Sequence, residues 1–289
     1  MNAPASLRAQ LAAPGMVIAP GAYDGIGARL IEQAGFSAVY MTGAGTSAAR
    51  GYPDFGLLTM TEMVDNAAVM ARACSIPLIA DADTGYGNEL NVTRAVREYE
   101  ARGVAAIHIE DQVSPKRCGH LDGKEVISRE DFVSKIRAAV EARRTREFVI
   151  IARTDSRAMM SMDEAIWRGN AALEAGADIV FVEATQSLEE IAAVPKNVRG
   201  PCLLNVVPGG RTPNLDLREA EAMGYKLAIL PGLMLKAAIE AGDAALAELK
   251  ATHMAPPVTQ TVAQTFRRFG ADEWDALRTR FNAGATMGR

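Results

Sequence analysis

The sequence has few of the features that mark a disulfide-stapled, fibrous or membrane-spanning protein. Its three cysteines, Cys74, Cys118 and Cys202, are odd in number and widely spaced, which argues against a disulfide framework and favours a reduced compartment. Aromatic residues make up only 6% of the chain, and no apolar run approaches the roughly 18 residues that cross a bilayer. The segment 1–10 holds no apolar stretch with a cleavage site, so we expect a cytoplasmic protein without a membrane partner.

The chain also lacks an excess of basic residues. It has 31 Lys and Arg against 35 Asp and Glu, a net charge of -4, and no long basic run. This balance argues against a nucleic-acid surface and favours a small-molecule partner. With 289 residues, 49% of them hydrophobic and 23% charged, the chain is long enough to bury a core and too apolar to be disordered.

Short apolar runs alternate with amphipathic helical stretches along most of the chain. The runs are apolar throughout, which is typical of parallel strands covered on both faces. Repeated strand and helix units over about 250 residues predict an α/β fold, the closed (β/α)₈ TIM barrel. A doubly wound open sheet is the alternative. The eight runs are residues 16–19, 37–41, 77–80, 105–110, 148–152, 178–183, 202–206 and 226–230.

No change of composition marks a domain boundary, so we expect a single domain over residues 1–289. Residues 1–250 would form the barrel, and 251–289 a helical tail for subunit packing. The tail carries an apolar stripe that needs a surface to cover, either its own barrel or a neighbouring subunit. The stripe consists of Val262, Phe266, Phe269, Trp274, Leu277 and Phe281.

Acidic residues stand where strands are expected to end, the catalytic side of such barrels. Asp81 and Asp83 are two residues apart, so an extended chain would turn both to one side, with Glu110 on the next strand. Three converging carboxylates would repel each other unless a cation lies among them. Oxygen ligands alone suit Mg²⁺, with Mn²⁺ as a second choice. The alternative is that these acids cap helices or pair with nearby basic residues.

A long loop, about residues 112–126, follows the fourth expected strand and contains Lys116-Arg117-Cys118-Gly119-His120. Long loops in compact barrels often cover active sites. A cysteine flanked by Lys, Arg and His should have a lowered pKa, which would make Cys118 a proton donor or a nucleophile. We assign Cys74 and Cys202 to packing.

Two further polar residues lie on the expected strands. His108 would share the inward side of its strand with Glu110, and we expect a hydrogen-bonded core histidine rather than a metal ligand. Arg153 ends the fifth strand and could clamp a substrate carboxylate with its planar guanidinium. An ion pair with Asp155 or Glu183 is the alternative for Arg153.

Four segments taken together resemble the isocitrate lyase and phosphoenolpyruvate mutase superfamily, in order and over most of the chain. The resemblance implies a (β/α)₈ barrel whose eighth helix is exchanged with a partner subunit. It also implies a Mg²⁺ site, a mobile gating loop and a homotetramer built from dimers, which would account for the apolar tail. The segments are Asp81-Ala-Asp83-Thr-Gly-Tyr-Gly, Ile-His-Ile-Glu110-Asp-Gln, Lys116-Arg-Cys118-Gly-His120 and Ala-Arg153-Thr-Asp.

Within the superfamily, Cys-Gly-His resembles the lyase branch, which cleaves a carbon–carbon bond of a 2-hydroxy acid. By this resemblance Asp81 and Asp83, with Glu110 through water, hold Mg²⁺, and Cys118 protonates the departing carbanion. Tyr40 and Glu183 are both candidates for positioning the hydroxyl group, and the base stays unidentified. Asp81 would also contact the substrate. The carboxylates of the substrate would be fixed by Lys116, Gly119, His120, Arg153, Asn205 and backbone near Thr42, Gly43 and Ala44.

Two departures from the family pattern narrow the expected substrate. The segment 121–124 lacks the Arg of typical methylisocitrate lyases, so a dicarboxylate is favoured over a tricarboxylate. Pro208 stands where dimethylmalate-type lyases have Glu. Because a dicarboxylate is favoured and the Cys-Gly-His motif resembles the lyase branch, we expect a lyase for a 2-alkylmalate such as 2,3-dimethylmalate. The alternatives are methylisocitrate cleavage, oxaloacetate decarboxylation, carboxyvinyl-carboxyphosphonate phosphorylmutase activity and a non-catalytic binding barrel.

Overall fold

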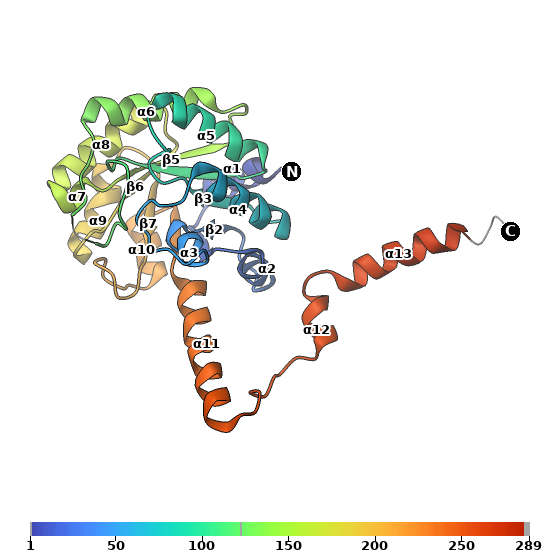
Figure 1. Cartoon of the computed structure of the whole chain (residues 1–289). Helices are drawn as coiled ribbons and strands as arrows, with labels where there is room; N and C mark the ends of the chain where they lie inside the picture. Colours follow the sequence, from blue (N-terminus) through green and yellow to red (C-terminus); the bar gives the residue numbers. More distant parts are fainter. Residues whose placement is uncertain (1, 122, 286–289) are drawn as a thin grey trace. The chain divides into compact units, whose positions relative to one another are not determined.

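A computed structural model of the chain describes residues 2–121 and 123–285. Its eight parallel strands close into a barrel in sequence order, and the last strand pairs with the first. Helices surround these strands (Figure 1). This confirms the (β/α)₈ barrel and excludes the open sheet. The strands are β1 Val17–Ala22, β2 Val39–Met41, β3 Leu78–Asp81, β4 Ala106–Glu110, β5 Val149–Thr154, β6 Ile179–Val182, β7 Cys202–Asn205 and β8 Leu227–Leu230.

Alternate residues of each strand enter two different parts of the core. On β3, Ile79 packs with the residues that fill the barrel interior, whereas Leu78 and Ala80 pack with the residues between strands and helices. Because both faces are buried, every residue of β3 is apolar until the carboxyl end, where Asp81 stands. The polar residues of the strands are thus concentrated at one end of the barrel.

Ten helices within residues 2–236 accompany the strands. Ser128 caps α6, accepting a hydrogen bond from the Asp131 amide. Helix α4 begins after a capping box formed by Thr59 and Glu62. The helices are α1 Ala3–Ala12, α2 Gly25–Gln33, α3 Gly43–Ala48, α4 Met60–Ala73, α5 Glu89–Ala101, α6 Arg129–Ala142, α7 Ser156–Met159, α8 Met162–Glu174, α9 Leu188–Asn197 and α10 Leu217–Met223.

The chain divides into two compact units, Met1–Lys236 and Ala237–Arg289. Helix α11 (Leu233–Thr252) crosses the division, and α12 (Val262–Arg267) and α13 (Ala271–Ala285) follow it. The aromatic side chains of the tail are exposed, with Phe266 at 60%, Trp274 at 73% and Phe281 at 68%. Among the described residues, no helix is both long and apolar enough to cross a membrane.

Candidate active site

A cavity of about 200 Å³ lies at the carboxyl ends of the strands. It contains most of the residues that the sequence predicts for the site; Gly43, Asp83, Glu110 and Lys116 do not line it. Its walls come from segments far apart in the sequence, which only the closed barrel brings together. The lining residues are Tyr40, Thr42, Ala44, Asp54, Asp81, Cys118, Gly119, His120, Arg153, Glu183, Asn205, Val207, Pro231, Gly232, Leu235 and Lys236.

The two aspartates after β3 do not lie on one extended strand. Strand β3 ends at Asp81, and Asp83 has φ +46°, so the chain has already turned. The prediction from an extended chain was therefore wrong, because the backbone bends within this motif. The bend lets the Asp83 amide donate to Asp81 Oδ1 at 2.9 Å, and the Gly43 amide donates to Asp81 Oδ2 at 3.2 Å.

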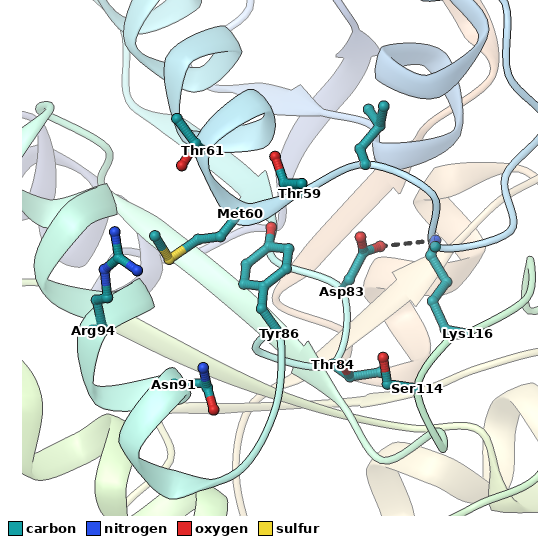
Figure 2. A pocket seen from close by; sticks show the side chains of 12 residues that line it. Thr59, Met60, Thr61, Asp83, Thr84, Tyr86, Asn91, Arg94, Ser114 and Lys116 are labelled. Atoms are coloured by element: carbon teal, nitrogen blue, oxygen red, sulfur yellow. Dashed lines mark ion pairs between the residues drawn. The ribbon is translucent and has the colours of Figure 1, made fainter.

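A buried lysine pairs with two acids from different segments. Lys116 Nζ lies 2.9 Å from Asp83 Oδ1 and 2.5 Å from Asp54 Oδ1. Asp83 and Lys116, which do not line the first cavity, line a second cavity of about 360 Å³. Figure 2 shows their ion pair there. Burial raises the pKa of Asp83 to about 6 despite Lys116. Burial also opposes ionisation of Asp81, but His108, Lys116 and Arg153 more than offset it, and the pKa of Asp81 falls to about 2.

Glu110 ends β4 with a fully buried carboxyl group. Neither oxygen accepts a well-aligned hydrogen bond from a described residue, although Arg153 Nη1 lies 3.2 Å from Oε2. Burial therefore raises the pKa of Glu110 well above its usual value. Arg153 also donates from Nε to Asp155 Oδ2 at 2.9 Å, so its ion pair with Asp155 is present.

Asp81, Asp83 and Glu110 are the residues that the sequence predicts as cation ligands. Among the described residues, no three His, Cys, Asp or Glu side chains gather tightly enough to make a metal centre by themselves. Mg²⁺ does not require such a group, because it keeps several waters and uses only one or two carboxylates directly. The buried Glu110 oxygens, which lack well-aligned donors, and the all-oxygen ligand set fit a hard cation held partly through water.

The thiol of Cys118 is half-buried in the cavity, and its backbone amide donates to the Asp54 carbonyl at 3.1 Å. Burial, reinforced by the negative charge of Asp54, raises the pKa of this thiol. The predicted lowering of the pKa was wrong. The charge of Lys116 is already matched by Asp54 and Asp83, and Arg117 is directed over the Phe55 ring. A thiol that stays protonated is suited to donating a proton.

His120, Glu183 and Asn205 form a connected polar group. Asn205 Nδ2 donates to both carboxylate oxygens of Glu183, at 3.1 and 3.3 Å, and His120 Nε2 lies 3.0 Å from Glu183 Oε1. His120 Nδ1 accepts from the Arg211 amide, so the ring proton of Nε2 lies on the side of Glu183, close to its carboxylate but without a well-aligned hydrogen bond. Burial opposes ionisation of Glu183, but Arg153 and His120 hold its pKa well below the usual range.

Tyr40 and His108 make a second buried pair inside the barrel. Tyr40 Oη and His108 Nε2 lie 2.7 Å apart. Burial lowers the pKa of His108 to about 4, so the ring is neutral near pH 7, in keeping with the expected hydrogen-bonded core histidine. Burial raises the pKa of Tyr40 well above its usual value, so its phenol stays protonated.

Sequence reasoning missed several residues that shape the site. Asp54, which holds Lys116, lies in the irregular segment before α4, where no periodic pattern marks it. Gly43 was predicted as a backbone contact of the substrate, but its steric role was missed: a Cβ there would lie 2.5 Å from Asp81 Oδ2. Lys124, from the cysteine loop itself, forms a buried ion pair with Asp155 just after β5. Only Pro-Asp-Phe-Gly, a turn-like cluster around Asp54, gives a sequence signal for this part of the site.

A closed parallel barrel with acids and a cysteine loop at the carboxyl ends of its strands is the architecture of a TIM-barrel enzyme. The chain matches the family described as phosphoenolpyruvate phosphomutase over residues 7–250. It therefore belongs to the phosphoenolpyruvate mutase/isocitrate lyase superfamily, as its motifs indicate.

Two similar sequences are named as lyases. The chain is 51% identical over 242 residues to 2,3-dimethylmalate lyase of Eubacterium barkeri, covering 83% of this chain and 84% of that protein. It is 44% identical over 234 residues to 2-methylisocitrate lyase of Aeropyrum pernix, covering 81% and 75%.

Solved structures share the fold over nearly the whole chain. A crystal structure of 2,3-dimethylmalate lyase matches with a TM-score of 0.92 and 42% identity, covering 98% of this chain and 96% of that one. Phosphonopyruvate hydrolase in complex with oxalate and Mg²⁺ matches with a TM-score of 0.88 and 33% identity, covering 97% and 99%.

Proposed function

We propose that the protein is a Mg²⁺-dependent carbon–carbon lyase that cleaves a 2-hydroxy dicarboxylate of the 2-alkylmalate type. The products would be a 2-oxo acid such as pyruvate and a short carboxylic acid. The observation that carries the proposal is the single cavity that holds the Cys118 thiol beside Arg153, Glu183 and Asn205. The 51% identity to a 2,3-dimethylmalate lyase supports the substrate class.

The cleavage is a retro-aldol step. A base takes the proton of the 2-hydroxyl group, the C2–O bond becomes a carbonyl, and the C2–C3 bond breaks. The electron pair of that bond passes to C3 and is delocalised into the adjacent carboxylate. The Cys118 thiol then gives its proton to C3. Since burial keeps this thiol protonated, it is ready to donate.

The charge states of Tyr40 and Glu183 separate their roles. Glu183 stays a carboxylate near neutral pH because Arg153 and His120 stabilise the charge. Tyr40 stays a phenol because it is buried. Of these two, Glu183 is therefore in the form that can accept the hydroxyl proton, and Tyr40 is in the form that can donate a hydrogen bond to the substrate oxygen.

Asp81 and Asp83, with Glu110 through water, would hold the divalent ion. When bound, the ion supplies positive charge that offsets the negative charge developing on the carboxylate-bearing fragment. Arg153 and His120 would orient the substrate carboxylates, with Lys116, Asn205 and the backbone of Thr42, Gly43, Ala44 and Gly119.

The cavity lining includes apolar residues that could contact alkyl substituents. Val207, Pro231 and Leu235 line the cavity together with Ala44, while the charged groups of the cavity include Asp81 and Arg153. A substrate with both carboxylates and methyl groups matches this mixed lining. This favours a 2-alkylmalate over a substrate with a third carboxylate.

Methylisocitrate cleavage is the second candidate, and one residue favours it. Lys236 lines the cavity and donates to the Pro208 carbonyl, but it forms no ion pair with any described residue. An unmatched ammonium group at this position could pair with a third carboxylate. Lys236→Met should then weaken methylisocitrate turnover and leave 2,3-dimethylmalate turnover unaffected.

The apolar stripe of the tail supports a proposal about assembly. We infer that the tail packs against a second copy of this chain, with helix exchange, in a homotetramer built from dimers. We also expect a reducing, cytoplasmic location, since Cys74, Cys118 and Cys202 are free thiols.

The proposal is tested by assaying purified protein with Mg²⁺ for release of 2-oxo acid. The panel is 2,3-dimethylmalate, 2-methylisocitrate, isocitrate, oxaloacetate and phosphonopyruvate. We expect the highest kcat/KM on 2,3-dimethylmalate, and loss of turnover on removing the metal with EDTA. A higher kcat/KM on oxaloacetate or phosphonopyruvate would contradict the lyase assignment. No turnover on any compound would favour a non-catalytic binding barrel.

A further inference from the structure

Lys124 occupies an unusual place for a lysine in a surface loop. Its side chain is 1% exposed, and that of its partner Asp155 is fully buried. Lys124 Nζ lies 3.0 Å from Asp155 Oδ1 and also donates to the carbonyl of Gly119. The lysine therefore joins the Cys118–His120 segment of its own loop to the end of β5.

Asp155 connects this contact to Arg153, the residue proposed to orient a substrate carboxylate. Its carboxylate accepts from Arg153 Nε at 2.9 Å and Nη2 at 3.2 Å while it also pairs with Lys124. Its backbone amide donates to Asp111 Oδ1 at 2.8 Å, which fixes the position of Asp155. One rigid carboxylate thus holds both Arg153 and the lysine that carries the loop.

The segment that Lys124 holds is packed directly on the site. A Cβ added at Gly119 would lie 2.5 Å from Arg153 Nη2 and 2.6 Å from Glu183 Cγ. The Gly119 peptide must therefore lie close over both side chains, and its carbonyl needs a donor there because an unpaired buried carbonyl is costly. Lys124 supplies that donor.

We propose that Lys124 is a positioning residue that holds the Cys118–His120 segment over the cavity and so places the thiol for proton transfer. It touches no substrate and acts through Gly119 and Asp155. The inference rests on the proposed role of Cys118 as proton donor. Without Lys124, the Gly119 carbonyl would lose its donor and Asp155 would keep only Arg153, so the segment would lift from the site.

The test is the rate at which iodoacetamide alkylates each cysteine, measured by peptide mass spectrometry. Lys124→Met keeps the length of the side chain and removes its charge and donors. We expect Cys118 to react at least about tenfold faster in this variant, with kcat lowered about 10- to 100-fold and KM changed less. Cys74 and Cys202 should react as in the wild type, since Lys124 contacts neither of them.

Lys226→Met is the matched control. Lys226 also donates to backbone carbonyls, those of Ala13 and Gly15, but it precedes β8 at the opposite end of the barrel. It should alter neither Cys118 alkylation nor turnover. Lys124→Arg, which keeps the charge and the donors, should restore much of the slow alkylation of Cys118.

An unchanged Cys118 rate in folded Lys124→Met would overturn the proposal. If that variant unfolds, all three thiols react faster together, and Lys124→Gln then takes its place with the same expected and contrary results. The alkylation rate does not depend on turnover. A protein that cleaves none of the tested acids but shows the Cys118 effect would refute the proposed function, and with it the role of Lys124 in proton transfer, but would still show that Lys124 holds the Cys118–His120 segment over the cavity.

Discussion

At the scale of single residues, burial and local pairing give identical side chains different chemistry. Asp81 and Asp83 are both buried, yet the pKa of Asp81 falls to about 2 while that of Asp83 rises to about 6. Burial raises the pKa of both carboxyl groups, but at Asp81 the charges of His108, Lys116 and Arg153 lower the pKa by more than burial raises it. Carboxyl groups with separated pKa values are typical of active sites, where one group stays ionised and another can hold a proton.

Cys118→Ser tests the proton donor. A serine hydroxyl is a much weaker acid than a thiol, so kcat for cleavage should fall at least about 100-fold. Mg²⁺ affinity, measured by calorimetry, should not change because the thiol holds no metal. Cys74→Ser is the control and should keep full activity. If Cys118→Ser cleaved substrate as fast as the wild type, the lyase mechanism given above would be wrong.

Gly43→Ala tests the position of Asp81. The new methyl group would lie 2.5 Å from Asp81 Oδ2 and would displace the carboxylate. We expect the dissociation constant for Mg²⁺ to rise at least about tenfold, as for other changes that misplace a metal ligand. Gly242→Ala is the control, because its methyl group meets no atom within 4 Å. Equal Mg²⁺ affinity in both variants would remove Asp81 from the ligand set.

At the scale of elements, ion pairs between helices hold the outer ring of the barrel. Glu164 of α8 accepts from Arg129 of α6 and, at 2.8 Å, from Arg168 one turn further along α8. Arg168 also pairs with Asp111 just after β4 at 3.1 Å. This chain of charges joins two helices to the strand that carries Glu110.

Glu164→Gln should destabilise the protein in a pH-dependent way. Hydrogen bonds from Arg129 and Arg168 lower the pKa of Glu164 from 4.5 to about 2. A lowered pKa means that the ionised form is stabilised by folding. This contribution is complete above pH 4.5 and is lost as the pH falls towards 2. We expect Tm at neutral pH to fall by roughly 2–4 °C.

Urea unfolding across the acidic range measures this effect. The difference in unfolding free energy between wild type and Glu164→Gln should shrink steadily below pH 4.5. Glu174→Gln is the control: its ion pair with Arg199 is about two-thirds exposed and should contribute little at any pH. A constant difference for Glu164→Gln would show that its charge is not the stabilising feature.

At the scale of the whole molecule, the tail leaves large apolar side chains exposed. Phe266, Trp274 and Phe281 are each at least 60% exposed, an arrangement that favours burial against another surface. If the protein assembles through its tail as proposed, replacing all three with Ser should give a smaller species in analytical ultracentrifugation. The circular dichroism of the barrel should persist. A wild-type monomer, or an unchanged assembly in the variant, would contradict the proposed tail packing.

The strand pattern, the barrel and the location of the site at the strand ends could all be predicted from the sequence. Runs such as 148–152 are apolar on both faces, and this local pattern depends only on neighbouring residues. The motifs around Asp81 and Cys118 also lie in short contiguous segments, which is why they indicate the superfamily. The bend at Asp83 was missed because its φ of +46° is rare for a residue with a side chain.

Contiguous residues alone thus determined the class of fold, the family and which side chains could do chemistry. The tertiary structure decided their charge states and partners. The contact of Lys116 with Asp54 joins residues 62 positions apart, and that of Lys124 with Asp155 joins residues 31 apart. Pairing and burial set the pKa of Cys118 and the placement of its loop, and both arise only when distant segments meet at the mouth of the barrel.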